Sequence, residues 1–352
     1  MKFLLIIYIL LGLNCSSSNA LVRPRSGTAS KSRTIPPTAV TGDVTANFES
    51  ECSLDRPQLS AVNVIVFYTA SSSGFTFLPP SPDITLFQLH SLLPNGTVFD
   101  VFIPAEEAVI TTVGEGSSGD FKGTNASWTG SYDLQHYKIE VNSPANGVVG
   151  TFNLRSLAPG HYPCGPVRSG ESMMVAPEIG WANAVPDGDA DVDFTLAGVK
   201  VAFKGVGYHD KNWSDQVFTN NVASWYWGHG RLGHYSIVWF DTLGTDGKEY
   251  VSSFVSKHDK IIVSSCDAGS IKVRPSGSSP YPPKISTPNP SGFMIEIDLG
   301  EEGVMNVEVT AEAISTAADG LYTEWVGTMT GSVNGGEKMT GVASFEMFKL
   351  TN

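Results

Sequence analysis

Residues able to do proton chemistry gather with aromatic residues in one short region of the sequence, 205–241. This region contains Gly205-Val-Gly-Tyr-His-Asp-Lys-Asn-Trp213, Trp225-Tyr-Trp-Gly-His-Gly-Arg231 and Tyr235-Ser-Ile-Val-Trp-Phe-Asp241. Aromatic faces beside histidine, aspartate and lysine can bury a large apolar ligand while a few donors and acceptors orient it. The residues that we expect to be catalytic are His229, Asp241 and Lys211.

Each of these residues also has a structural interpretation. His209 and Asp210 could form a hydrogen-bonded pair that fixes a turn between two domains. The tryptophans within 225–239 alternate along strands, where inward-facing residues usually form the core. Asp241 ends an apolar strand, so it either caps the following turn or lies at the rim of a cavity.

Other chemistries lack their motifs. The sequence has no G-x-S-x-G elbow, no phosphate-binding loop between a strand and a helix, and no H-E-x-x-H zinc motif. We therefore predict no metal and no cofactor. The net charge of -13 argues against nucleic acid and anionic membrane surfaces as partners. We expect a hydrophobic small-molecule substrate and no obligate protein partner.

The elements that position these residues are predicted to be β-strands throughout. Segments 61–68, 85–90 and 97–103 are rich in β-branched and aromatic residues and are bounded by Pro, Gly or Asn. Eight further strands are predicted at 223–228, 235–243, 250–257, 260–265, 293–299, 305–311, 321–332 and 337–348. This spacing is typical of an antiparallel sandwich or barrel. We predict an all-β protein with an N-terminal domain at 41–210 and a C-terminal barrel at 211–352.

The N-terminus predicts entry into the secretory pathway. Lys2, an apolar run and the small residues before Leu21 resemble a signal peptide at 1–20, which a flexible leader at 21–40 follows. The apolar run is too short for stable membrane insertion. We therefore expect a secreted or vesicular protein, with glycosylation at the sequons of Asn95, Asn125 and Asn212. Cys52 and Cys164, both in the first predicted domain, are expected to form a disulfide.

The aromatic region resembles the carotenoid 1,2-hydratase superfamily and its fungal branches, which include the Diels-Alderases of polyketide and cytochalasan-type clusters and the kievitone hydratases. The resemblance implies two lipocalin-like domains with the ligand held between them. The Asp-His-x-Trp element of the carotenoid hydratases falls at Asp210–Trp213, with Lys211 in place of the histidine. Their Tyr-x-Asp pair falls at Trp239 and Asp241, so the resemblance implies Asp241 as an acid.

The implied cavity suits a Diels-Alderase that folds a linear polyene for [4+2] cyclisation. A hydrogen bond from His229, Tyr226 or Lys211 would activate the dienophile carbonyl. The alternative is a hydratase of prenylated isoflavonoids, with Asp241 or Glu51 as the acid. A third possibility is a carrier without turnover. The residues expected to contact the substrate are Glu51, Tyr68, Asp100, His209, Asp210, Trp213, Tyr226, Trp239 and Trp325.

Overall fold

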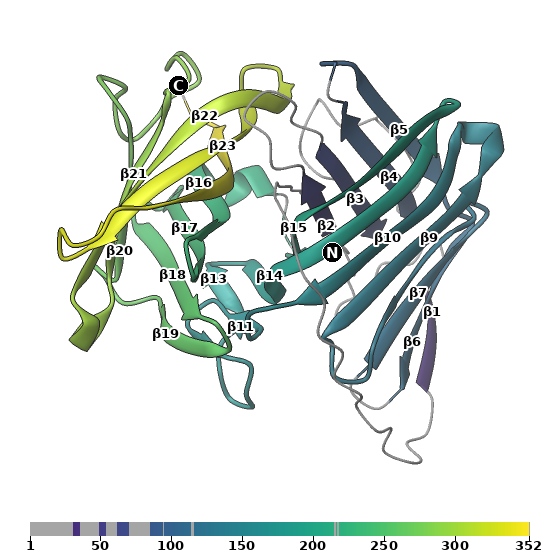
Figure 1. Ribbon diagram of the computed structural model, residues 1–352, viewed down its shortest axis with the longest axis horizontal. Helices are drawn as coiled ribbons and strands as arrows, with labels where there is room; N and C mark the ends of the chain where they lie inside the picture. Colours follow the sequence, from purple (N-terminus) through teal and green to yellow (C-terminus); the bar gives the residue numbers. More distant parts are fainter. Residues whose placement is uncertain are drawn as a thin grey trace.

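The structure is a computed structural model that describes residues 31–35, 49–53, 62–69, 85–93, 95–113, 116–214, 216 and 218–351. The predicted signal peptide at 1–20 lies outside these residues. Described segments lie almost entirely in antiparallel strands, which confirms the all-β prediction (Figure 1). No helix in this part of the chain is long and apolar enough to cross a bilayer.

The N-terminal half is built on a curled antiparallel sheet of twelve strands. Its central strands run in the order β6-β7-β8-β9-β10-β14, and β15 continues the sheet on the far side of β14 to pair with β2. The strands are β1 (Lys31–Ile35), β2 (Glu49–Ser53), β6 (Glu107–Val113), β7 (Gly116–Lys122), β8 (Ala126–Gly130), β9 (His136–Ser143), β10 (Val148–Ser156), β11 (His161–Tyr162), β12 (Gly165–Pro166), β13 (Met174–Ala176), β14 (Ile179–Leu196) and β15 (Val199–Trp213).

Strand β1 corrects part of the predicted leader. Residues Lys31–Ile35 were expected within a flexible segment, but they pair antiparallel with β6. The backbone of β6 pairs on its other side with β7, so β1 takes up the ladder hydrogen bonds that the edge of the sheet would otherwise expose. The rest of the predicted leader lies outside the described residues.

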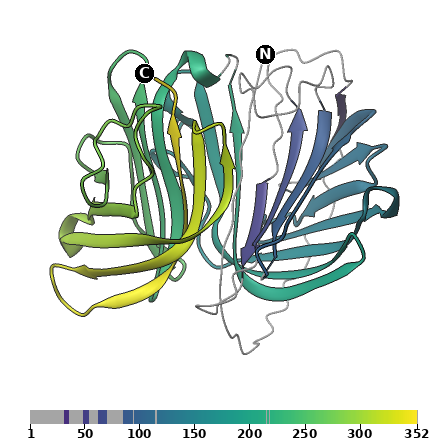
Figure 2. The ribbon, with the colours of Figure 1, turned by 90° about the horizontal axis from the view of Figure 1, so that it is seen from above.

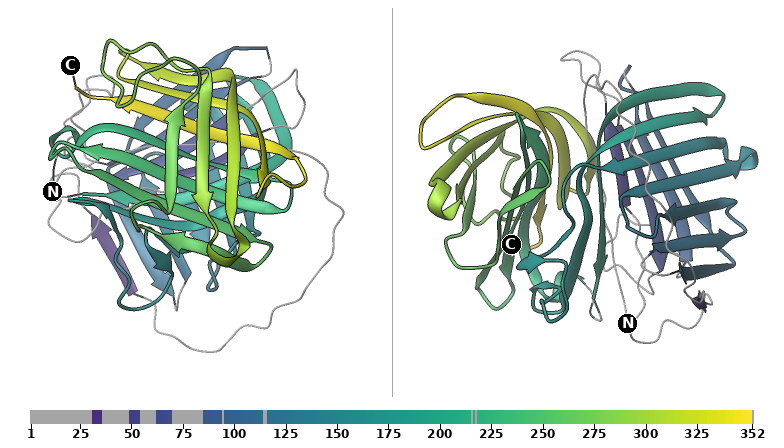
Figure 3. Two further views of the ribbon diagram at one scale, coloured as in Figure 1. Left: turned by 90° about the vertical axis from the view of Figure 1, so that its left-hand side faces the viewer. Right: turned by 60° about the horizontal axis from the view of Figure 1, so that its bottom comes forward.

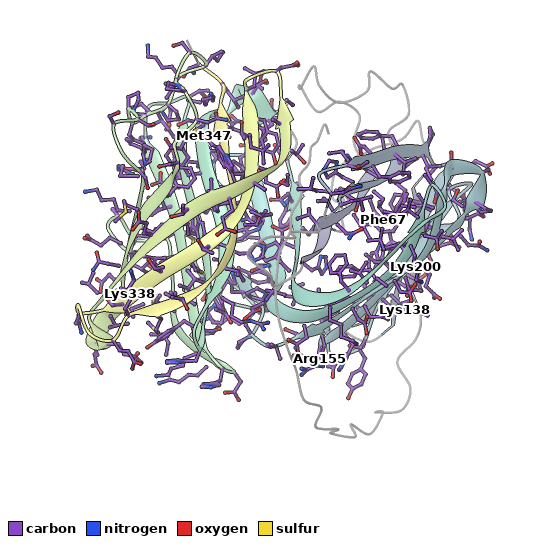
Figure 4. All side chains as sticks on the ribbon, turned by 45° about the horizontal axis from the view of Figure 1, so that its top comes forward. Phe67, Lys138, Arg155, Lys200, Lys338 and Met347 are labelled. Carbon is purple, nitrogen blue, oxygen red and sulfur yellow. A yellow bond between two sulfur atoms is a disulfide. The ribbon has the colours of Figure 1, made fainter. Side chains whose placement is uncertain are left out.

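A second, three-stranded sheet contributes side chains both to the core of the N-terminal half and to the core between the two halves. It consists of β3 (Val62–Thr69), β4 (Thr85–Leu92) and β5 (Val98–Pro104). Because side chains alternate along a strand, Ile65 and Phe67 enter the core of the N-terminal half, where Phe67 packs 4.9 Å from Phe121. Figure 4 shows Phe67 among the side chains that fill the concave side of this half. Val62 and Val64 instead face the C-terminal half.

The C-terminal half is a nine-stranded antiparallel sheet that curls around its own core, as Figures 2 and 3 show. Its spatial order is β19-β18-β17-β16-β24-β23-β22-β21-β20. The strands are β16 (Val222–Leu232), β17 (Tyr235–Gly244), β18 (Glu249–Lys257), β19 (Lys260–Ser265), β20 (Ile271–Pro275), β21 (Gly292–Asp298), β22 (Val304–Ala318), β23 (Tyr322–Val333) and β24 (Met339–Lys349). Eight of these match the predicted strands, and β20 is additional. Three short 3-10 turns complete the fold, at Pro144–Asn146, Phe218–Asn220 and Gly300–Glu302.

The boundary between the N-terminal and C-terminal sheets lies slightly later in the sequence than predicted. The expected boundary after residue 210 lies inside β15, which continues to Trp213, and the second sheet begins with Val222. Across the boundary, Arg231 of β16 forms a two-pronged ion pair with Asp187 of β14, with Nε and Nη2 donating at 3.0 and 2.6 Å. This partly buried pair fixes the position of one half against the other.

The disulfide prediction is wrong. Cys164, in the turn between β11 and β12, bonds to Cys266, which follows β19. Strand β12 packs against β19, so the two cysteines come together across the two halves. Cys52 lies in β2, where its backbone pairs with Gly207. The prediction failed because it assumed that both partners belong to one domain.

Candidate functional site

Strand β16 presents its side chains alternately to two different environments. Trp225 and Trp227 belong to the core between the two halves, whereas Tyr226 belongs to the core of the C-terminal sheet. His229 shares the outward face with Trp227 by this alternation, and its ring stacks on Tyr208 of β15 at 4.4 Å. The outward face of β16 therefore forms one wall of the interface between the halves, packed directly against β15.

The opposite wall carries a buried aspartate with three donors. Asp210 Oδ2 accepts hydrogen bonds from Trp181 Nε1 at 2.5 Å and from the Tyr208 hydroxyl at 2.8 Å, and Oδ1 accepts from Asn212 Nδ2 at 3.2 Å. The Tyr208 ring also meets Trp227 edge-on at 5.2 Å. Asp210 thus orders the aromatic wall, as the pair-forming alternative suggested, although its partners differ from the expected His209.

Two glutamates lie at the centre of the outward face of the C-terminal sheet. Glu324 of β23 and Glu346 of β24 are paired in register and are 0% and 1% exposed. Glu346 accepts a hydrogen bond from Trp225 Nε1, and Glu324 accepts one from the Ser344 hydroxyl at 3.2 Å. Burial raises the pKa of both carboxyls well above their ordinary value, and the neighbouring Glu346 raises that of Glu324 further. Burial therefore favours the protonated form of both carboxyls more strongly than it is favoured in an exposed glutamate.

A cavity of about 290 Å³ lies beside this acid pair, between the three-stranded sheet and β22. Thr316 lines the cavity and hydrogen-bonds Glu324, so one hydroxyl separates the cavity from the acid. His90 Nε2 lies 3.3 Å from the same Thr316 hydroxyl and 3.1 Å from the Ser315 carbonyl. Its Nδ1 lies 3.9 Å from Asp100 Oδ1. The lining residues are Val64, Gln88, His90, Val98, Asp100, Ser315, Thr316 and Ala317.

The structure separates Asp241 from His229, although the sequence analysis combined them. Asp241 pairs in register with Tyr226, so it faces the interior of the C-terminal sheet. Its carboxyl accepts from Arg274 Nη1 at 2.9 Å and from the Val273 amide at 3.2 Å. Burial raises the pKa of Asp241 to about 7, with Glu249 adding to the shift and Arg274 opposing it.

Two tryptophans predicted to contact the substrate also lie inside the C-terminal sheet. Trp239 is fully buried there, and Trp325 stacks on Phe345 at 5.7 Å. Tyr226 packs against Phe293 at 4.7 Å in the same core. All three residues fill the centre of the curled sheet, which is the structural interpretation that the sequence offered for Trp239.

The alternation of β15 places three other candidates on the far side from Asp210. His209 meets Tyr137 of the N-terminal core edge-on at 4.6 Å. Lys211 lies over the ring of Trp213 at 5.3 Å, and burial lowers the pKa of Lys211 to about 8. These side chains face the N-terminal half and are not brought together with His229.

The remaining predictions concern two substrate-contact residues of the N-terminal half and the three glycosylation sites. The side chains of Glu51 and Tyr68 lie outside what the structure describes. Asn95 and Asn125 are exposed, and their glycosylation stays a prediction. Asn212 is 8% exposed and donates to Asp210, so a glycan on it is incompatible with this fold.

The acid pair and His90 were missed by sequence reasoning. Glu324 and Glu346 lie at buried positions of β23 and β24, among largely apolar neighbours. A glutamate at a position where the strand pattern predicts a buried residue was the signal that could have found them. Asp100, a predicted contact residue, does line the cavity. No cluster of three or more His, Cys, Asp or Glu suited to a metal occurs among the residues described.

Comparison with known proteins adds to this geometry. A family model described as Diels-Alderase-like matches residues 66–273. Quinolone epoxide rearrangement protein asqO of Emericella nidulans is 37% identical over 75% of this chain and 72% of its own. Quinolone epoxide rearrangement protein penF of Penicillium thymicola is 36% identical over 81% of this chain and 80% of its own.

Two solved structures share the fold. The crystal structure of CghA with Sch210972 gives a TM-score of 0.68 at 17% identity, covering 90% of this chain and 95% of the other. Kievitone hydratase from Nectria haematococca gives a TM-score of 0.56 at 14% identity, covering 90% and 91%.

Fold and comparisons together define a lipocalin-like β protein and an enzyme of isomerase type. The chain belongs to the Diels-Alderase-like family. The family resemblance and the fold class predicted from the sequence are therefore confirmed.

Proposed function

We propose that this enzyme rearranges an epoxide of a compact aromatic substrate, of the quinolone type, by acid catalysis between its two halves. The observation that supports this most is the buried pair of Glu324 and Glu346 beside the cavity, because burial raises the pKa of both carboxyls. The names of the two relatives above 35% identity, asqO and penF, favour the same reaction.

The acid step uses Glu324 and the hydroxyl of Thr316. In the proposed reaction the Thr316 proton passes to the epoxide oxygen, while Glu324 returns a proton to Thr316 and becomes a carboxylate. One carbon–oxygen bond breaks, and a substituent moves with its electron pair to the cationic carbon. The proton on the new hydroxyl then returns by the same route, which leaves a carbonyl and an unchanged molecular formula.

The surroundings of the pair suit a cationic intermediate. Trp227, which pairs in register with Glu346, forms an aromatic cluster with His229 of β16 and Tyr208 of β15, in which His229 stacks on Tyr208 and Tyr208 meets Trp227 edge-on. Aromatic faces stabilise a nearby cation, by roughly 0.5–2 kcal/mol for each well-placed ring.

The second candidate is the [4+2] cyclisation of a linear polyene that the sequence predicted. The family description and Diels-Alderase poxQ of Penicillium oxalicum, 28% identical over 38% of this chain and 30% of its own, favour it. In that reaction Thr316 would donate a hydrogen bond to the dienophile carbonyl. The cavity volume of about 290 Å³ falls at the low end for ligand sites, which favours the compact aromatic substrate over a long chain.

Incubation of the purified protein with each substrate class distinguishes the two candidates. We expect an aryl epoxide of a quinolone to give a product of unchanged mass with a new carbonyl band. A linear polyene tetramic acid is expected to stay unchanged. Cyclisation of the polyene with no change in the epoxide would replace the first candidate by the second.

We also propose that the protein matures in the secretory pathway. The Cys164–Cys266 disulfide supports this, because such bonds persist mainly in oxidising compartments. Localisation of a tagged full-length chain by fluorescence microscopy, compared with a chain lacking residues 1–20, tests the proposal. Identical cytosolic signals for both chains would contradict it.

A further inference from the structure

The floor of the cavity is an irregular segment of β22. The register between β22 and β23 shifts between Ile314 and Thr316, so Ser315 lies at a β-bulge. The Ser315 carbonyl is taken by His90 Nε2. Bulges are frequent next to active sites, where they redirect single side chains.

Ser315 combines deep burial with an unused hydroxyl. The residue lines the cavity and is 4% exposed, and its Oγ has no hydrogen-bond partner within the described residues. A buried hydroxyl without a partner costs roughly 1–3 kcal/mol. Such a cost is removed when a ligand supplies the missing acceptor.

The opposite side of the cavity supplies an acceptor of its own. The Asp100 side chain is 40% exposed and accepts from Gln88 Nε2 at 3.2 Å through Oδ1. No lysine or arginine among the described residues lines the cavity, which disfavours an anionic ligand. Burial lowers the pKa of His90, so the histidine is neutral and adds no charge at neutral pH. Val64, Val98 and Ala317 provide the apolar part of the wall.

We propose that this cavity is a subsite for an uncharged secondary amide, a lactam, whose carbonyl accepts from Ser315 and whose N–H donates to Asp100. A hydroxyl and a carboxylate facing one small cavity match the two polar atoms of that group. The subsite specifies the substrate class of the proposed function, and its role in turnover rests on that function. It orients the substrate so that the reacting carbon lies near Thr316.

Binding of two isosteric probes tests the subsite without any turnover. The probes are 2-quinolone, a lactam, and coumarin, in which a ring oxygen replaces the N–H. Calorimetry is expected to show 2-quinolone binding and coumarin binding at least threefold more weakly. Equal affinity for the two probes would overturn the proposal.

Matched serine variants locate the contact. Ser315→Ala is expected to weaken 2-quinolone binding by about 2- to 12-fold, the range for one hydrogen bond of 0.5–1.5 kcal/mol. Ser256→Ala is the control, because Ser256 is also fully buried with an Oγ that lacks a partner in the described part of the chain, but it does not line the cavity. Unchanged binding by Ser315→Ala would contradict the subsite.

A third variant separates this proposal from the proposed function. Glu324→Gln is expected to bind 2-quinolone as the wild type does while losing turnover. Lactam binding in a protein that rearranges no epoxide would leave the subsite standing and remove the reaction. If the protein rearranges the epoxide and Ser315→Ala leaves the KM unchanged, the proposed reaction stands and the lactam subsite is contradicted.

Discussion

At the scale of single residues, burial decides which groups can act as acids. Glu324 and Glu346 are buried away from the water that would solvate a negative charge, so burial raises the pKa of both carboxyls and favours their protonated forms. Asp210, close by, is surrounded by three hydrogen-bond donors that suit an ionised carboxylate. A carboxyl group therefore serves as acid or as organiser according to its neighbours.

His161 gives a prediction for stability at low pH. The residue is 0% exposed and stacks on Phe254 at 4.0 Å, and burial lowers its pKa to about 4. The folded protein therefore binds the proton less readily than the unfolded chain, whose histidine has a pKa near 6.5. The stability contributed is present above pH 6.5 and is lost as the pH falls towards 4. We expect the His161→Phe variant to lose less stability over this interval, by about 1.4 kcal/mol per pH unit.

Urea unfolding of both proteins at several pH values measures this difference. The exposed His136, whose environment is polar, provides the control as His136→Phe. Parallel loss of stability by wild type and His161→Phe would contradict the prediction.

At the scale of elements, the alternation of side chains along β16 and its partner β17 sorts the candidates. It sends Trp227 and His229 to one side and Tyr226 and Asp241 to the other. Sequence alone predicted the strands and the aromatic region, because β-branched and aromatic runs are local signals. It could not predict which face of each strand meets the partner half, because β16 is buried on both faces.

The close packing of β16 predicts the effect of a single methyl group. A Cβ at Gly228 would lie 2.3 Å from the ring of Trp239 and 2.5 Å from the Ser344 carbonyl. Gly228→Ala is therefore expected to destabilise the protein by about 1–3 kcal/mol, as overpacking does. Gly336→Ala, in the exposed turn after β23, should change stability by less than about 0.5 kcal/mol. Thermal unfolding checks both, and equal effects would refute the packing argument.

At the scale of the whole molecule, the two halves act as one unit. The Arg231–Asp187 ion pair and the Cys164–Cys266 bond both cross between them. The cysteine pairing could not be predicted from the sequence, because three cysteines after the signal peptide allow several pairings and the fold alone brings one pair together. Similarly, Glu324 and Glu346 lie more than eighty residues beyond the aromatic region, and the pairing of β24 with β16 brings them to it.

Loss of the disulfide should be costly because the bond closes a loop of 102 residues. We expect Cys266→Ser to lower the free energy of unfolding by about 2–5 kcal/mol. Cys52→Ser is the control and should have a much smaller effect. Peptide mapping by mass spectrometry identifies the pair directly, and a Cys52–Cys164 peptide would contradict the structure.

The central claim is that the acid acts between the two halves rather than inside the C-terminal sheet. Its most direct test compares the rate of epoxide rearrangement in Glu324→Gln and Asp241→Asn, two variants that each remove one buried carboxyl group. The account predicts a fall of at least 100-fold for Glu324→Gln, the usual effect of removing a general acid, and a fall of less than about tenfold for Asp241→Asn. Loss of turnover in Asp241→Asn alone, with both variants folded, would contradict it.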